Sequence, residues 1–339
     1  MEKNWTTSDL VKLFRLNTST KTPIIYAEKK GEIPKSSSGK RGSISIRQWE
    51  TSQLPKIGEK FGFLRKPDKQ LIISVYTPKG GVSKTTLTAN LGRALAFNGI
   101  RTLVIGLDFQ RSLTRYILPP EPVENFDDIG KSNHLLGLHH FLFENAPIDK
   151  VVLKTDLPTL DIIPETPDLN FMAKKMRVEN RREYIFKEKL IKKLNKYDIV
   201  LFDCTPGWND LTENALVAAN NVIMPAACEI ECYEALQTNL GEVADFQSTM
   251  HLQWDNYLMI PSMLENNTIS QNIYAQYLSL YKSSIIPMPT RRSIVAQEAR
   301  AAHQSIFEYA PTSNLADDYY GIITSIWKKL VNQAGDHNE

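Results

Sequence analysis

Residues 79–86, with the sequence KGGVSKTT, hold the residue types that bind a phosphate group. Glycines let backbone N–H groups turn toward an anion, a lysine can reach the β- and γ-phosphates, and a threonine hydroxyl can bind Mg²⁺. An apolar, strand-like run at 71–76 precedes the segment and a helical pattern starts near residue 85, so a helix dipole adds positive potential. The sequence therefore predicts a nucleotide site built from Lys79, Gly80, Gly81, Val82, Ser83, Lys84, Thr85 and Thr86.

Two carboxylates follow the phosphate-binding segment at the ends of strand-like runs. Asp108 comes directly after the run 101–107, and Asp203 ends the apolar run 198–203. Side chains at the carboxyl ends of parallel strands meet at one edge of the sheet, where they can hold Mg²⁺ or orient a water molecule. Asp108 taken alone could equally cap a helix, so the order and spacing of the two residues carry the prediction. Residues 204–207 then read as a switch loop near the γ-phosphate.

The elements that must position these residues alternate along the chain between strand and helix. The strands are continuous apolar runs, which is typical of a parallel sheet covered by helices on both faces. The predicted fold is therefore α/β, a mostly parallel sheet flanked by helices, over residues 71–339. The predicted strands cover 71–76, 101–107, 160–163, 198–203, 221–225, 256–260 and 284–286, and the predicted helices cover 85–98, 168–195, 212–219, 231–248, 268–282 and 315–332, with a loop at 119–133.

Residues 1–64 form a separate basic unit, joined by a polar linker at 65–70. The first 70 residues hold fifteen lysines and arginines against seven aspartates and glutamates, a net charge of +8, so the rest of the chain carries −6. Two short helices, a basic hairpin and a further helix at 49–61 are the pattern of a winged helix-turn-helix. Such a charge favours nucleic acid as partner, although a solvated basic face is the plainer alternative. The expected DNA contacts of the hairpin are Lys35, Lys40, Arg41 and Arg47.

The bulk composition excludes several classes of protein. The chain has 339 residues, of which 42% are hydrophobic and 23% charged, as expected for a globular protein. Its three cysteines have neither disulfide nor zinc spacing, which favours a reducing compartment. The polar start predicts no signal peptide, and no apolar run reaches the roughly 18 residues of a spanning helix. We therefore expect a cytoplasmic protein without membrane contact.

These motifs together resemble those of ParA-type partition ATPases. Segment 79–86 looks like the deviant Walker A motif of that family. The residues around Asp108 look like its Walker A′ motif, and those around Asp203 look like its Walker B motif. The similarity extends over roughly residues 71–320. Residues 5–63 resemble a MerR-like helix-turn-helix, and the larger plasmid members of the family carry such an N-terminal domain and repress their own operon.

The resemblance implies a role for each site residue. Lys79 would reach the partner's phosphates across a homodimer, Lys84 would bind β/γ-phosphate in its own subunit, and Asp108 would position the attacking water. Mg²⁺ would be held by Thr85 directly and by Asp203 through water. The adenine would contact segment 260–263, and basic residues near the C-terminus would contact DNA non-specifically. The residues concerned are Pro261 and Met263 for the base, and Arg291, Arg292 and Arg300 for DNA.

Four positions depart from the family pattern. Ser83 stands where most members have glycine, and Gly106 replaces the first carboxylate of the usual Asp-x-Asp. Phe109 and Thr205 each replace a proline. Nucleotide binding should survive these changes, and hydrolysis should be slower than the family norm.

The resulting prediction is a plasmid partition ATPase that hydrolyses ATP with Mg²⁺ and then holds ADP. Binding of nucleotide would make it dimerise. It would bind DNA non-specifically as a dimer and operator DNA through its N-terminal domain, acting as autorepressor. A ParB-type centromere-binding protein would stimulate it, and it would associate with the nucleoid. Two alternatives stay open: a repressor that keeps nucleotide as a structural ligand, and a MinD-like ATPase that cycles on membranes.

Overall fold

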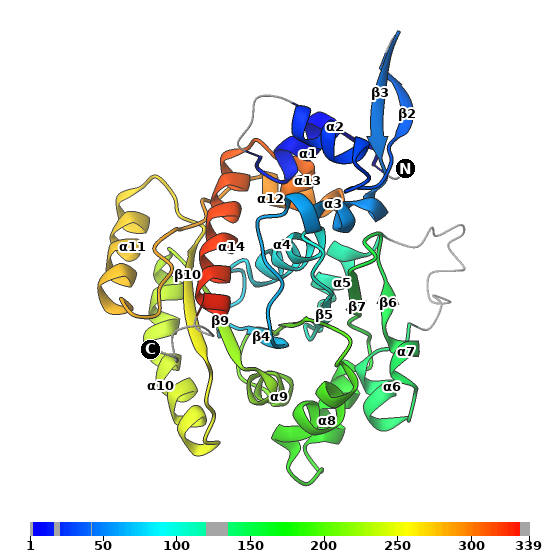
Figure 1. The fold of residues 1–339 in the computed structure, drawn as a ribbon. Helices are drawn as coiled ribbons and strands as arrows, with labels where there is room; N and C mark the ends of the chain where they lie inside the picture. The colour runs from blue at the N-terminus through cyan, green and yellow to red at the C-terminus, as the bar shows by residue number, and fades with distance from the viewer. Residues whose placement is uncertain (1–2, 17–20, 42, 120–134, 333–339) are drawn as a thin grey trace, which may run out of the picture.

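A seven-stranded sheet forms the centre of the computed structural model (Figure 1). Its strand order is β10-β9-β4-β8-β5-β7-β6, and every neighbouring pair is parallel except β6 with β7. The predicted α/β class is confirmed. The strands are β4 (Leu71–Val75), β5 (Thr102–Gly106), β6 (Leu153–Lys154), β7 (Leu160–Ile163), β8 (Ile199–Asp203), β9 (Asn221–Ala227) and β10 (Asn256–Ser262). The structure describes residues 3–16, 21–41, 43–119 and 135–332, so most of the loop predicted at 119–133 lies outside it.

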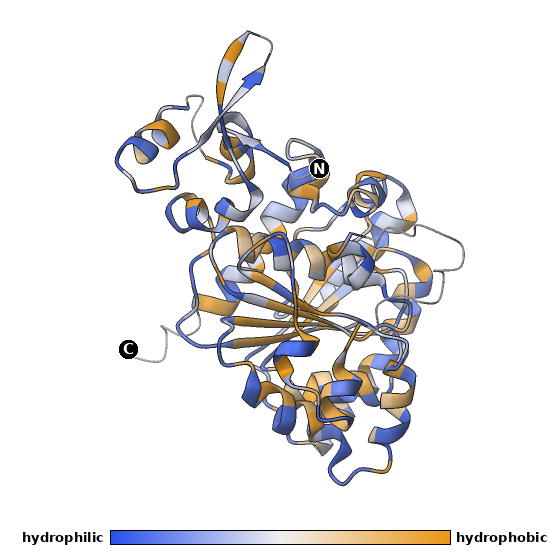
Figure 2. Ribbon diagram, turned by 90° about the vertical axis from the view of Figure 1, so that its right-hand side faces the viewer, coloured by the Kyte–Doolittle hydropathy of each residue, from blue (hydrophilic) through white to orange (hydrophobic). Residues whose placement is uncertain are grey.

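Helices cover both faces of the sheet, and the alternation along β8 shows why. Ile199 and Leu201 belong to one apolar cluster, whereas Val200 and Phe202 belong to another on the opposite face. Successive strand residues point to opposite faces, so a strand covered on both sides must be apolar throughout. Figure 2 shows these hydrophobic strands between two helical layers. The first face carries α4 (Lys84–Phe97), α5 (Ser112–Ile117), α12 (Val295–Ala301), α13 (Ile306–Tyr309) and α14 (Asn314–Asn332). The second face carries α6 (Leu138–Phe143), α7 (Ile148–Val151), α8 (Leu169–Met176), α9 (Asp210–Ala218) and α10 (Ile230–Thr249). Helix α11 (Thr268–Leu280) packs on α10.

The N-terminal residues fold into three helices and a three-stranded antiparallel sheet of order β1-β3-β2. Thr6 and Asp9 form a capping box at the first helix, as their types and spacing favour. The β2–β3 hairpin projects away from the central sheet (Figure 1). These elements are β1 (Trp5–Thr6), α1 (Thr7–Leu13), α2 (Thr22–Lys29), β2 (Ser37–Arg41), β3 (Ile44–Trp49) and α3 (Leu54–Phe61).

Two helices predicted from the sequence are wrong in extent. Trp49 does not begin a helix, because it pairs with Trp5 at the end of β3, and α3 starts only after a 3₁₀ turn. The long helix at 168–195 breaks after Met176 into a turn and short irregular helices. Residues of α9 explain the break: Asn214 donates to the Arg182 carbonyl over 2.7 Å and accepts from the Phe186 N–H over 3.1 Å. The strand predicted at 284–286 is reduced to one parallel bridge to β10.

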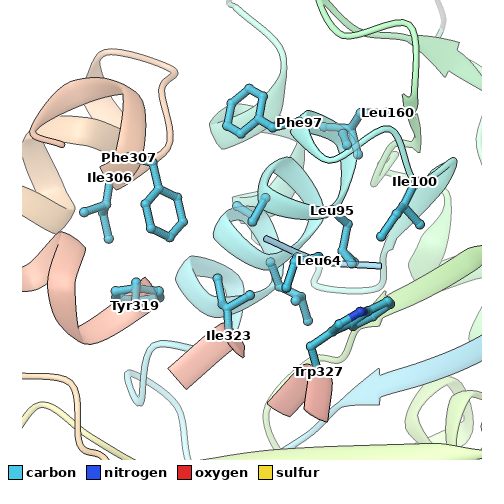
Figure 3. Close-up of a cluster of buried hydrophobic side chains, with 14 of the residues drawn as sticks. Leu64, Leu95, Phe97, Ile100, Leu160, Ile306, Phe307, Tyr319, Ile323 and Trp327 are labelled. Atoms are coloured by element: carbon cyan, nitrogen blue, oxygen red, sulfur yellow. The ribbon is translucent and has the colours of Figure 1, made fainter. Parts of the chain in front are cut away.

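The N-terminal unit packs directly on the C-terminal end of α4, and the two share one apolar core. A single apolar cluster includes Trp5, Phe97 and Trp327; Figure 3 shows part of it, with Phe97 and Trp327 labelled. Gly58 of α3 lies so close to α4 that a Cβ there would overlap the Phe97 carbonyl oxygen. The Asn98 side-chain oxygen accepts from the Leu64 N–H over 2.9 Å. Helix α4 therefore joins the sheet to the N-terminal unit.

Candidate active site

The phosphate-binding segment connects β4 to α4 at the carboxyl edge of the sheet. It lines a cavity of about 560 Å³, to which residues from distant parts of the chain contribute. Ser83 has a left-handed backbone, with φ 70° and ψ 20°, a conformation that costs an L-residue about 1–2 kcal/mol relative to glycine. The departure from glycine at this position is therefore a strained one. The predicted residues brought together in the cavity lining are Gly80, Gly81, Val82, Ser83, Lys84, Thr85, Thr86, Asp108, Met263, Arg291, Arg292 and Arg300.

The Lys84 ammonium group is held inside the loop. It donates to the carbonyl oxygen of Lys79 over 2.7 Å and to that of Thr77 over 3.2 Å. Burial lowers the pKa of Lys84, an effect that the nearby Asp203 opposes. Lys79 is half-buried at the start of the loop. Its predicted contact to a partner stays a prediction.

Asp203 ends β8 directly beneath the start of α4. Its Oδ2 accepts from the Thr85 hydroxyl over 2.7 Å, and its Oδ1 accepts from the Thr88 hydroxyl over 3.0 Å. Complete burial raises the pKa of Asp203 to about 7, although both hydroxyl groups stabilise the carboxylate. A hydroxyl and a carboxylate oxygen this close are a suitable donor set for Mg²⁺. Thr88 was missed, and its only sequence signal is a position one helical turn after Lys84.

Asp108 lies on a tight turn between β5 and α5. Its carboxylate accepts from the Gln110 N–H over 2.9 Å, and its carbonyl oxygen accepts from the Arg111 N–H over 2.9 Å. The side chain is half-exposed and lines the cavity. The two carboxylates therefore differ: Asp203 is enclosed by hydroxyl groups, whereas Asp108 can reach solvent.

The segment predicted to contact a base ends β10 beside the phosphate loop. The Ser262 hydroxyl donates to the Val82 carbonyl oxygen over 3.1 Å, which ties the two segments together. Met263 lines the cavity with a left-handed backbone at φ 56°. Pro261 is buried within the strand.

The three C-terminal arginines predicted to contact DNA line the cavity beside the phosphate loop. Arg291 forms a two-pronged ion pair with Asp318 over 2.8 and 2.7 Å. Arg292 pairs with Glu229 and with Glu265. These pairings leave less of their charge for DNA than the sequence suggests, and Arg300 on α12 faces the same cavity.

The four residues of the N-terminal unit predicted to contact DNA lie on or beside the projecting hairpin, apart from the phosphate loop. Lys35 and Lys40 are exposed, and Arg41 ends β2. Arg47 is exposed and donates to Glu28 of α2 over 2.7 Å. Glu28 also accepts from the Ser36 N–H, so it fixes the base of the hairpin to α2.

Comparison with known proteins agrees with this geometry. A family model described as an AAA domain matches residues 70–256. The chain belongs to this family. The AAA-domain chain is 27% identical over 241 residues to the chromosome partitioning protein ParA of Caulobacter vibrioides (strain NA1000 / CB15N), covering 70% of this chain and 86% of the relative. It is also 27% identical to the sporulation initiation inhibitor protein Soj of Bacillus subtilis (strain 168), covering 75% and 97%. These similarities support a P-loop ATPase of the ParA type.

Solved structures share the fold of this AAA-domain chain. A putative plasmid partition protein from Borrelia burgdorferi B31 bound to AMPPNP has a TM-score of 0.62 at 21% identity, covering 77% of this chain and all of that one. McdA from Cyanothece, in complex with ATP, has a TM-score of 0.65 at 17% identity, covering 76% and 96%. The family match begins at residue 70 and leaves the N-terminal unit outside it. None of the described helices is long and apolar enough to cross a membrane.

Proposed function

We propose that the protein is a partition ATPase whose ATP-bound homodimer binds DNA and whose hydrolysis of ATP releases it. One observation carries the proposal: Lys84, Thr85 and Asp108 line one cavity at the phosphate loop, and the Thr85 hydroxyl donates to the buried Asp203 behind it. Two of its relatives are chromosome partitioning proteins, which supports a replicon as the cargo that this protein moves. The protein would be cytoplasmic and associated with the nucleoid.

Five residues at or beside the phosphate loop would divide the work of ATP hydrolysis. Lys84 leaves its loop carbonyls to bind the β- and γ-phosphates, and backbone N–H groups of the loop bind the remaining oxygens. The Thr85 hydroxyl and Asp203, the latter through water, would hold Mg²⁺, which would supply positive charge to the phosphate groups. Asp108 orients the attacking water, and Lys79 reaches the phosphates of the second subunit.

The N-terminal unit would bind operator DNA and make the protein an autorepressor. Its basic hairpin projects from the molecule (Figure 1), and the first 70 residues carry a net charge of +8 against −6 for the rest of the chain. Phosphate contacts by Lys35, Lys40 and Arg47 would make this binding strongly dependent on salt. Because the unit shares a core with α4, a change at the phosphate loop has a direct path to it.

ATP turnover of the full chain tests the proposal. We expect slow hydrolysis, below about 1 s⁻¹, that rises with DNA and a ParB-type partner encoded beside the gene. Lys84→Ala should lower the rate at least about 100-fold, since it removes the charge that stabilises the transferred phosphate. Asp108→Ala should bind ATP normally and fail to hydrolyse it. Lys174→Ala is the matched control, because this exposed lysine lies on α8 outside the cavity.

The alternatives predict different results in the same assay. Equal rates for the wild type and Lys84→Ala would contradict the ATPase proposal. Operator binding without stimulated hydrolysis would favour a repressor with nucleotide as a structural ligand. Binding to liposomes that requires α14 would favour a membrane-cycling ATPase.

A further inference from the structure

The chain replaces the absent carboxylate at position 106 with one from another strand. Gly106 ends β5, and a Cβ there would overlap Cδ of Glu165 and lie 2.6 Å from its Oε1. Glu165 follows β7 and is completely buried. A side chain at position 106 and the present Glu165 side chain therefore exclude each other. The glycine makes room for a carboxyl group that enters from the neighbouring strand.

The Glu165 carboxylate holds the first turn of α5, which follows the Asp108 turn. Its Oε1 accepts from the Leu113 N–H over 3.1 Å, and its Oε2 accepts from the Thr114 N–H over 2.7 Å. The Thr114 hydroxyl also donates to Oε2 and accepts from the Glu165 N–H over 2.9 Å. A buried carboxylate needs such donors, because burial raises its pKa and penalises its charge.

The Glu165 main chain holds the Asp108 turn itself. Its carbonyl oxygen accepts from Arg111 Nε over 3.0 Å. Arg111 has a left-handed backbone at φ 56°, and its N–H closes the turn on the Asp108 carbonyl oxygen. Glu165 thus contacts the chain two residues before Asp108, at Gly106, and three residues after it, at Arg111.

We propose that Glu165 is the positioning residue for Asp108, taking over the place of the carboxylate that other ParA-type motifs carry at position 106. The proposal rests on the proposed ATPase function, in which Asp108 orients water. Glu165 does not line the cavity, so it acts through the turn and not on the nucleotide. Misplacing a catalytic group by about 1 Å can cost about 100-fold in rate. Loss of Glu165 should therefore lower kcat and leave nucleotide affinity nearly unchanged.

The test compares Glu165→Ala, Glu165→Gln and the double variant Gly106→Asp/Glu165→Ala in the full chain. We expect kcat to fall about 10- to 100-fold in Glu165→Ala and less in Glu165→Gln, which keeps the shape and one acceptor. The Kd for a fluorescent ATP analogue should change less than about 3-fold. The double variant should recover much of kcat, because the aspartate introduced at position 106 restores a carboxylate beside the same donors. Glu179→Ala, which removes an exposed carboxylate, is the control.

Hydrogen exchange of residues 107–115 without nucleotide separates this proposal from the ATPase proposal. It should be faster in Glu165→Ala than in the wild type and slow again in the double variant. A wild type without turnover that shows this pattern would refute the ATPase function and leave the positioning role standing. Unchanged kcat and exchange in a folded Glu165 variant would overturn the positioning role, as would a double variant no better than Glu165→Ala. If Glu165→Ala does not fold, Glu165→Gln decides by the same two readouts.

Discussion

The two ends of α4 are built in opposite ways. At its N-terminus the chain is polar: Ser83 has a left-handed backbone, Lys84 donates to loop carbonyls, and Asp203 is buried among hydroxyl groups. At its C-terminus it is tightly packed and mostly apolar, with Phe97 against Trp5 and against Gly58. A buried charge there, Arg93, is paired with Glu308.

The two ends of α4 therefore have different tasks: the N-terminal end forms the candidate site, and the C-terminal end anchors the N-terminal unit. Strain and buried charge cost free energy and are kept where a ligand can be bound. Close packing of apolar groups stabilises and transmits displacement, because a packed interior deforms little. Helix α4 therefore has a responsive end at the phosphate loop and a rigid end that carries the N-terminal unit.

The largest effect should come from the buried charge at the responsive end. The pKa of Asp203 is raised to about 7 in the folded chain, so the folded state binds its proton more tightly than the unfolded state does. The contribution of the Asp203 carboxyl group to the free energy of unfolding is fully present below about pH 4. It is lost as the pH rises through 7, and the loss is roughly 4 kcal/mol. Urea unfolding in EDTA from pH 4 to pH 8 measures it, and Asp203→Asn should flatten the dependence. Equal slopes for both proteins would contradict the burial argument.

A change of one methyl group should break the rigid end. Gly58→Ala places a Cβ against the Phe97 carbonyl and should lower the free energy of unfolding by about 3 kcal/mol. Gly241→Ala is the matched control, since no atom lies within 4 Å of its Cβ and it sits inside α10. That variant should gain about 0.5 kcal/mol. Thermal unfolding compares the two, and similar losses would show that the close approach is not rigid.

Relief of backbone strain should give the smallest effect. Ser83→Gly removes the cost of the left-handed conformation and should stabilise the chain by about 1 kcal/mol. The greater freedom of glycine in the unfolded chain offsets part of this gain. Urea unfolding of Ser83→Gly beside the wild type measures the difference, and a loss of stability would mean that the serine side chain makes a compensating contact.

The sequence predicted the parts of the site that depend on local spacing and missed those that depend on tertiary contacts. The phosphate loop, the strand ends carrying Asp108 and Asp203 and the parallel sheet follow from short motifs and apolar runs. Glu165 could not be found, because its role appears only when β7 lies beside Gly106. The break in the helix predicted at 168–195 likewise depends on hydrogen bonds to Asn214. The shared core of the N-terminal unit and α4 depends on close packing that no local pattern encodes.

The affinity of the full chain for a fluorescent non-specific DNA duplex tests most directly whether the phosphate loop controls DNA binding. It should be measured with a non-hydrolysable ATP analogue and Mg²⁺, with ADP and without nucleotide. We expect binding at least about 10-fold tighter with the ATP analogue, a coupling of about 1.4 kcal/mol, and no such gain in Lys84→Ala. The same affinity in all three states would contradict it, since a ligand that does not distinguish two states cannot shift them.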